Sequence, residues 1–75
     1  MGNEPECAEI VLEQPLDPAL RNELPAKLEH EPGIVSAYYA GETRLVVCYE
    51  VEYFTRLTLL DMVRGLGARA ELGEE

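Results

Sequence analysis

The chain has 75 residues, and its 15 Asp plus Glu against six Lys plus Arg give a formal net charge of −9. This charge argues against nucleic acid and anionic membrane surfaces as partners, because phosphate contacts need a cationic patch. The length allows one small hydrophobic core, so we predict a single domain over residues 1–75 with an ordered core at about 8–72.

The chain opens with a strand and the start of a helix. Between residues 8 and 12 inward apolar side chains alternate with outward ones, which predicts a half-buried β-strand. Asp17 and Pro18 then predict a helix start, because aspartate is favoured at the N-cap and proline at the first helical position. We therefore interpret Asp17 as a helix cap whose carboxylate accepts hydrogen bonds from free backbone amides.

The predicted helix has one apolar face and one defect. Three leucines recur every four residues from Leu20 to Leu28 and share a face. Pro25 interrupts the pattern, because it lacks the amide hydrogen that a helix interior uses, so we expect a bend or a new helix start there. The Pro-Gly pair at 32–33 ends the helix.

Two strands joined by a turn come next. Residues 34–40 (IVSAYYA) and 43–53 (TRLVVCYEVEY) are rich in β-branched and aromatic residues, and Gly41 with Glu42 makes the turn between them. In the second of these strands, alternate apolar residues from Leu45 to Val51 are expected to face inward. Cys48 then faces outward, on the side of the sheet away from the core.

The last part of the chain predicts a helix and a closing strand. Thr55 is interpreted as the N-cap of a helix that ends at Gly67, where a left-handed residue suits the C-terminal cap. Residues 68–72 (ARAEL) form the short closing strand. The order strand, helix, strand, strand, helix, strand predicts an α+β, ferredoxin-like βαββαβ sandwich, with a four-stranded antiparallel sheet in order 4-1-3-2 and both helices on one face.

The sequence shows neither an export signal nor a membrane span. The N-terminus lacks the basic region and apolar run of a signal peptide, and no stretch approaches about 18 apolar residues. We therefore expect a cytoplasmic protein without membrane insertion, in which Cys7 and Cys48 are thiols by default. A second hypothesis places the two cysteines next to each other. If the first and third strands pair with Glu13 near Thr43, then Cys7 falls near Cys48 on the open sheet face, as a disulfide or a two-thiolate site.

From about residue 8 to residue 72 the sequence resembles the heavy-metal-associated domain family. That family includes soluble copper chaperones and the N-terminal domains of metal-pumping ATPases. The matching pieces are the Pro-Gly-Ile at 32–34, the alternating strand that ends in Tyr49 and Glu50, the helix start at Thr55, and the Leu-Gly at 66–67. Their joint spacing carries the resemblance, since each piece alone is common.

The resemblance implies a metal-binding loop that this sequence has replaced. The family carries Met-x-Cys-x-x-Cys between the first strand and the first helix, and the spacing puts these three positions at Pro15, Asp17 and Leu20. Soft Cu(I) prefers a near-linear pair of sulfurs, and zinc prefers sulfur or imidazole, so a carboxylate and a leucine do not replace two thiolates. We therefore expect no cofactor in this loop. The candidates left for Cu(I) or Zn(II) are Cys7 with Cys48, or carboxylates near Asp17.

The sequence shows no set of residues that would support catalysis. It shows no nucleophile–base pair, no phosphate-binding glycine loop and no histidine metal motif, so we predict that the protein is not an enzyme. The leading hypothesis is a protein–protein interaction or regulatory module in a metal-handling context, with a basic protein surface as its partner. One alternative is a metal carrier with the non-standard ligands named above. The other is an ACT-like regulatory domain that binds a small molecule, since that class shares the expected topology.

Overall fold

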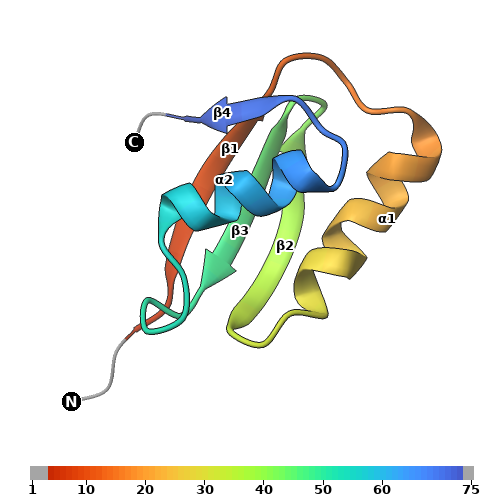
Figure 1. Cartoon of the computed structure of the whole chain (residues 1–75). Helices are drawn as coiled ribbons and strands as arrows, with labels where there is room; N and C mark the ends of the chain where they lie inside the picture. Colours follow the sequence, from red (N-terminus) through yellow and green to blue (C-terminus); the bar gives the residue numbers. More distant parts are fainter. Residues whose placement is uncertain (1–3, 74–75) are drawn as a thin grey trace.

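The computed structural model describes residues 4–73 and has the predicted topology (Figure 1). The elements are β1 (Glu6–Leu12), α1 (Pro18–Glu29), β2 (Ile34–Gly41), β3 (Arg44–Tyr49), α2 (Arg56–Gly65) and β4 (Ala70–Leu72). The strands form one antiparallel sheet in order β2-β3-β1-β4, which is the predicted order read from the other edge. The predicted single domain also includes residues 1–3 and 74–75, which lie outside the described residues.

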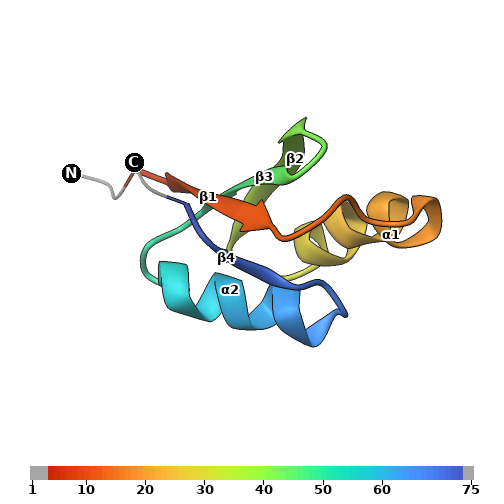
Figure 2. The ribbon, with the colours of Figure 1, turned by 90° about the horizontal axis from the view of Figure 1, so that it is seen from above.

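Both helices contribute to a core on one face of the sheet. The buried apolar residues come from the inward faces of the strands and from both helices: Ala8, Ile10, Leu12, Leu24, Leu28, Ala37, Leu45, Val47, Tyr49, Leu59, Leu60, Val63, Ala68 and Ala70. Seen from above, α2 lies on one side of the sheet, and within residues 4–73 no helix covers the other side (Figure 2). No helix in the same range is long and apolar enough to cross a membrane.

The ladder between β1 and β3 decides which side chains face the helices. Cys7 lies opposite Cys48, and the alternate β1 residues from Ala8 to Leu12 point into the core. The amide of Leu12 donates to the carbonyl of Thr43 at 2.7 Å. Leu12 therefore lies opposite Thr43 and Glu13 is the next residue along, so the expected nearness of Glu13 to Thr43, and of Cys7 to Cys48, is confirmed.

Three strand boundaries differ from the predicted ones by two residues or more. β4 begins at Ala70 and not at residue 68. β1 begins at Glu6 and not at residue 8, because Glu6 pairs with Tyr49 at the end of β3. β3 ends at Tyr49 and not at residue 53, because the chain turns there and the amide of Tyr53 donates to the carbonyl of Glu50 at 2.9 Å. The turn leaves Val51 40% exposed, so its predicted inward position is wrong.

Pro25 lies inside the continuous helix α1, so the helix does not start anew there. Because proline has no amide hydrogen, the carbonyl of Arg21, four residues earlier, loses its helical donor. The hydroxyl of Tyr39 in β2 donates to this carbonyl at 2.8 Å. A side chain of the sheet thus supplies the hydrogen bond that proline removes.

Two further contacts fix α1 to β2. The guanidinium carbon of Arg21 lies 4.2 Å from the centre of the Tyr39 ring, within cation–π range. The carboxylate of Glu29 accepts a hydrogen bond from the amide of Ala37 at 3.0 Å, on the edge strand of the sheet. Burial raises the pKa of the Tyr39 hydroxyl above its usual 10.0, and the charge of Arg21 offsets only part of this rise. The hydroxyl is therefore protonated at neutral pH and can donate its hydrogen bond.

We expect Tyr39→Phe to lower the free energy of unfolding by about 1 to 2 kcal/mol, because the partly buried Arg21 carbonyl then lacks a donor. Urea denaturation measures this change. Tyr38→Phe is the matched control: Tyr38 is 52% exposed on the same strand, and its loss of a hydroxyl should leave stability unchanged.

A double-mutant cycle with Pro25→Ala isolates the cause. Alanine restores an amide hydrogen at position 25, so Tyr39→Phe should destabilise the Pro25→Ala protein less than the parent. Equal losses in the two backgrounds would contradict the role given to the Tyr39 hydroxyl.

Candidate functional site

The β1–α1 loop gathers the three positions at which the family carries its metal ligands. A hollow of about 180 Å³ is lined by Gln14, Pro15, Leu16, Asp17, Leu20, Gly67 and Arg69. Pro15, Asp17 and Leu20 thus lie around one space, at the junction of β1, α1 and the turn after α2. None of the seven residues offers a sulfur or an imidazole, so this hollow lacks the donors that a soft metal requires.

Asp17 occupies the N-cap position of α1, but its side chain makes no capping hydrogen bond. Its backbone is extended, and its carbonyl accepts the first helical hydrogen bond from the amide of Arg21 at 2.8 Å. The helix start at Pro18 is confirmed, whereas the predicted capping role of the carboxylate is wrong. The side chain of Asp17 is exposed at the rim of the hollow.

Arginines line the same hollows as the two carboxylates of this region. Arg69 lines the hollow beside Asp17, and it lines a neighbouring hollow of about 470 Å³ together with Glu13 and Arg64. A guanidinium charge at these places opposes the binding of a metal cation. Within residues 4–73 there is no group of three or more His, Cys, Asp or Glu that is placed to hold a metal ion. The carboxylates near Asp17 are therefore not gathered into a cation site.

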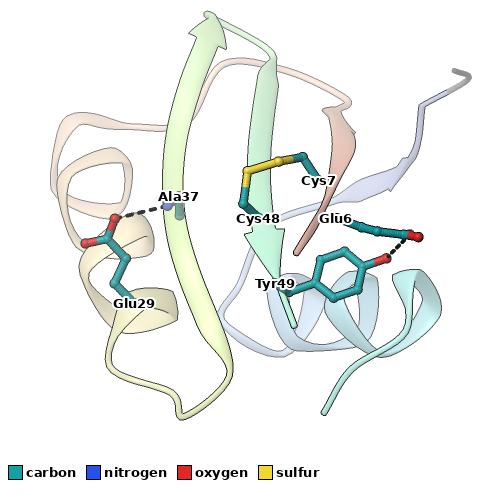
Figure 3. The surroundings of a disulfide bond; sticks show 6 residues. All are labelled: Glu6, Cys7, Glu29, Ala37, Cys48 and Tyr49. Carbon is teal, nitrogen blue, oxygen red and sulfur yellow. Dashed lines mark hydrogen bonds between the residues drawn. A yellow bond between two sulfur atoms is a disulfide. The ribbon is translucent and has the colours of Figure 1, made fainter. Parts of the chain in front are cut away.

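The two cysteines lie on the open face of the sheet and form a disulfide (Figure 3). Cys7 in β1 and Cys48 in β3 are direct partners in the ladder, with Cα atoms 3.9 Å apart and a sequence separation of 41. The default expectation of two thiols is wrong because this register places the side chains directly opposite each other. The structure has instead the disulfide that the second hypothesis proposed between Cys7 and Cys48.

The rest of the open face is mixed in character. Ser36 in β2 lies opposite Cys48, and in the next row Tyr38 lies opposite Val46. The guanidinium of Arg44 contacts the carboxylate of Glu9 at 2.9 Å across β1 and β3. Tyr38 and Val46 therefore lie on the open face, beside the ion pair between Arg44 and Glu9.

A group of apolar side chains is exposed at the opposite end of the sheet from the β1–α1 loop. Val51, Tyr53 and Leu57 are 40%, 60% and 66% exposed, and Glu50 and Glu52 alternate with the first two along the turn. We call these five residues the β3–α2 patch. Sequence reasoning missed it because the predicted strand ran through to residue 53, which hid the turn.

A third hollow lies between the helices. Its volume is about 300 Å³, and it is lined by Lys27, Leu28, His30, Glu31, Met62 and Leu66. His30 follows the last residue of α1 and is exposed. The volume lies at the small end of the range for ligand pockets. An ACT-like small-molecule site stays a prediction.

Comparison with known proteins gives one informative similarity. No protein-family model and no curated protein sequence matches this chain. The fold is similar to the solution structure of the N-terminal domain of a potential copper-translocating P-type ATPase from Bacillus subtilis in the Cu(I)-loaded state. The TM-score is 0.75 at 25% sequence identity, over 92% of this chain and 88% of that chain.

We expect a thiol assay on the unreduced, denatured protein to detect no thiol, and the same assay after reduction to detect two. Opening the cross-link should cost about 4 kcal/mol of stability by the chain-entropy argument, which lowers the thermal midpoint by roughly 15 °C or more. The double variant Cys7→Ser/Cys48→Ser is the control, and its midpoint should not respond to the reductant. Two reactive thiols in the unreduced protein would contradict the disulfide.

Proposed function

Because the chain has the fold of a heavy-metal-associated domain, we propose that it is a non-catalytic protein-interaction or regulatory module of a metal-handling system, whose β1–α1 loop carries no metal. One observation supports this most strongly. The three loop positions, Pro15, Asp17 and Leu20, line a common hollow, yet they present no soft ligand and share the space with Arg69. The lining of this hollow supports the proposal that the loop does not transfer a metal.

The similarity to a domain of a potential copper-translocating ATPase supports the metal-handling context. The similarity extends over 92% of this chain and 88% of that domain, so the two share most of their fold. A domain that keeps this shape without metal ligands in the loop can still bind the protein partners of a metal-carrying domain. We therefore assign its action to protein contacts.

The partner that fits best is a basic protein surface. The chain carries a formal charge of −9, and the β3–α2 patch combines three exposed apolar side chains with two glutamates. Interfaces commonly have an apolar centre with a polar rim, and opposite charge steers the two partners together. The patch also lies away from the loop, so binding there does not require the loop to hold a metal.

We expect Cu(I) binding to appear in the loop only when its thiolates are restored. In a Cys7→Ser/Cys48→Ser background, the chain should not compete with a chromophoric Cu(I) chelator under anaerobic conditions. Adding Asp17→Cys and Leu20→Cys to that background should create a two-thiolate site and measurable competition. The proposal fails if the background protein without the two new cysteines already binds Cu(I).

The partner is tested with a soluble domain of a metal pump or metal regulator that presents a basic surface. We expect binding that weakens as salt rises from about 50 to 500 mM, because exposed charges are screened at high ionic strength. Glu50→Lys together with Leu57→Ser should weaken binding measured by calorimetry. Glu42→Lys, an exposed charge reversal in the β2–β3 turn, is the matched control. Binding that is insensitive to both salt and the patch variants would contradict this assignment.

A further inference from the structure

The open face of the sheet carries sulfur chemistry that the proposed function does not use. Cys7 is exposed and Cys48 is half-buried, and within the described residues no helix covers them. They sit within a run of six paired residues between β1 and β3. The ladder therefore holds the two backbone positions next to each other by hydrogen bonds that do not depend on the bond between the sulfurs.

We propose that reduction of the Cys7–Cys48 disulfide creates a two-thiolate site for Cu(I) on the open sheet face. This site is separate from the β1–α1 loop, and it does not rest on the proposed partner binding. The structure contains the oxidised, closed form of the site. Disulfide sulfurs are not thiolates, and the thiolate is the form that ligates metal, so oxidation blocks binding.

The chemistry balances with a low-molecular-weight thiol of the glutathione class as the reductant. Two molecules of that thiol supply two electrons and two protons, the Cys7–Cys48 S–S bond breaks, and the two reductant sulfurs join in a new disulfide. Each protein sulfur is then a thiol. Cu(I) binding displaces the two thiol protons and forms two Cu–S bonds, with no change in the oxidation state of copper.

The donor set selects Cu(I) over zinc. Two sulfurs suffice for a soft monovalent ion that accepts near-linear coordination, whereas a zinc site is completed by four ligands, or by three and a water. Within residues 4–73 no third His, Cys, Asp or Glu is placed to join the pair. Glu9, the next open-face residue of β1, is held by the Arg44 guanidinium at 2.9 Å. The site therefore offers two ligands and no more.

Anaerobic competition with a chromophoric Cu(I) chelator tests the proposal. We expect reduced wild-type protein to take one Cu(I) per chain, and disulfide-intact protein to take none. Cys7→Ser and Cys48→Ser should each remove binding under reducing conditions, while Val46→Ser, a matched change on the same face of β3, should retain it. Zn(II) should not displace the bound Cu(I).

Circular dichroism in the same titration covers the case in which reduction unfolds the chain. Recovery of the folded spectrum on addition of one Cu(I) supports the site, because binding to the folded state stabilises that state. The proposal is overturned if reduced wild type takes no Cu(I), if Cys7→Ser binds as tightly as wild type, or if Cu(I) is held while the chain stays unfolded. If the double variant Cys7→Ser/Cys48→Ser also binds Cu(I), the ion is held elsewhere, for example in the β1–α1 loop. That result would overturn the function proposed above, in which the loop carries no metal.

Discussion

The antiparallel ladder between β1 and β3 is the constraint on which the rest of this structure depends. It places Ile10 opposite Leu45 on the side of the helices and Cys7 opposite Cys48 on the other side. Because side chains alternate along a strand, a shift of one residue would move the core residues of β1 to the open face. The same pairing therefore fixes the hydrophobic core, the partner of each cysteine and the point at which the chain leaves β1 for the loop.

The second requirement is that α1 is held against the sheet, since α1 forms one side of the loop. The Tyr39 hydroxyl and the Glu29 carboxylate connect α1 with β2, and Leu24 and Leu28 bury its apolar face. None of these contacts involves a residue at the family's metal-ligand positions. The contacts that hold α1 against the sheet therefore do not depend on Pro15, Asp17 or Leu20.

The sequence predicted the topology because the signals for each element are local. Thr55 accepts a hydrogen bond from the amide of Thr58 at 3.2 Å, and Gly67 adopts a φ of +109°, as the cap positions required. Contacts between distant segments were not predictable in this way. Nothing near Pro25 in the sequence indicates that Tyr39 completes its helix, and the Cys7–Cys48 pairing follows only once the register is known. At the candidate site, the sequence singled out Pro15, Asp17 and Leu20 but did not indicate that Arg69 lines the same hollow.

The central claim is that the sulfur chemistry of this chain lies on the open sheet face and is absent from the β1–α1 loop. The most direct measurement is an amide NMR spectrum of the reduced, isotopically labelled protein before and after one equivalent of Cu(I), recorded without oxygen. The account predicts that shifts concentrate at Cys7, Cys48 and the neighbouring Ser36, and that residues 14–17 stay unchanged. Shifts concentrated at Asp17 and Leu20, with Cys7 and Cys48 unaffected, would contradict it.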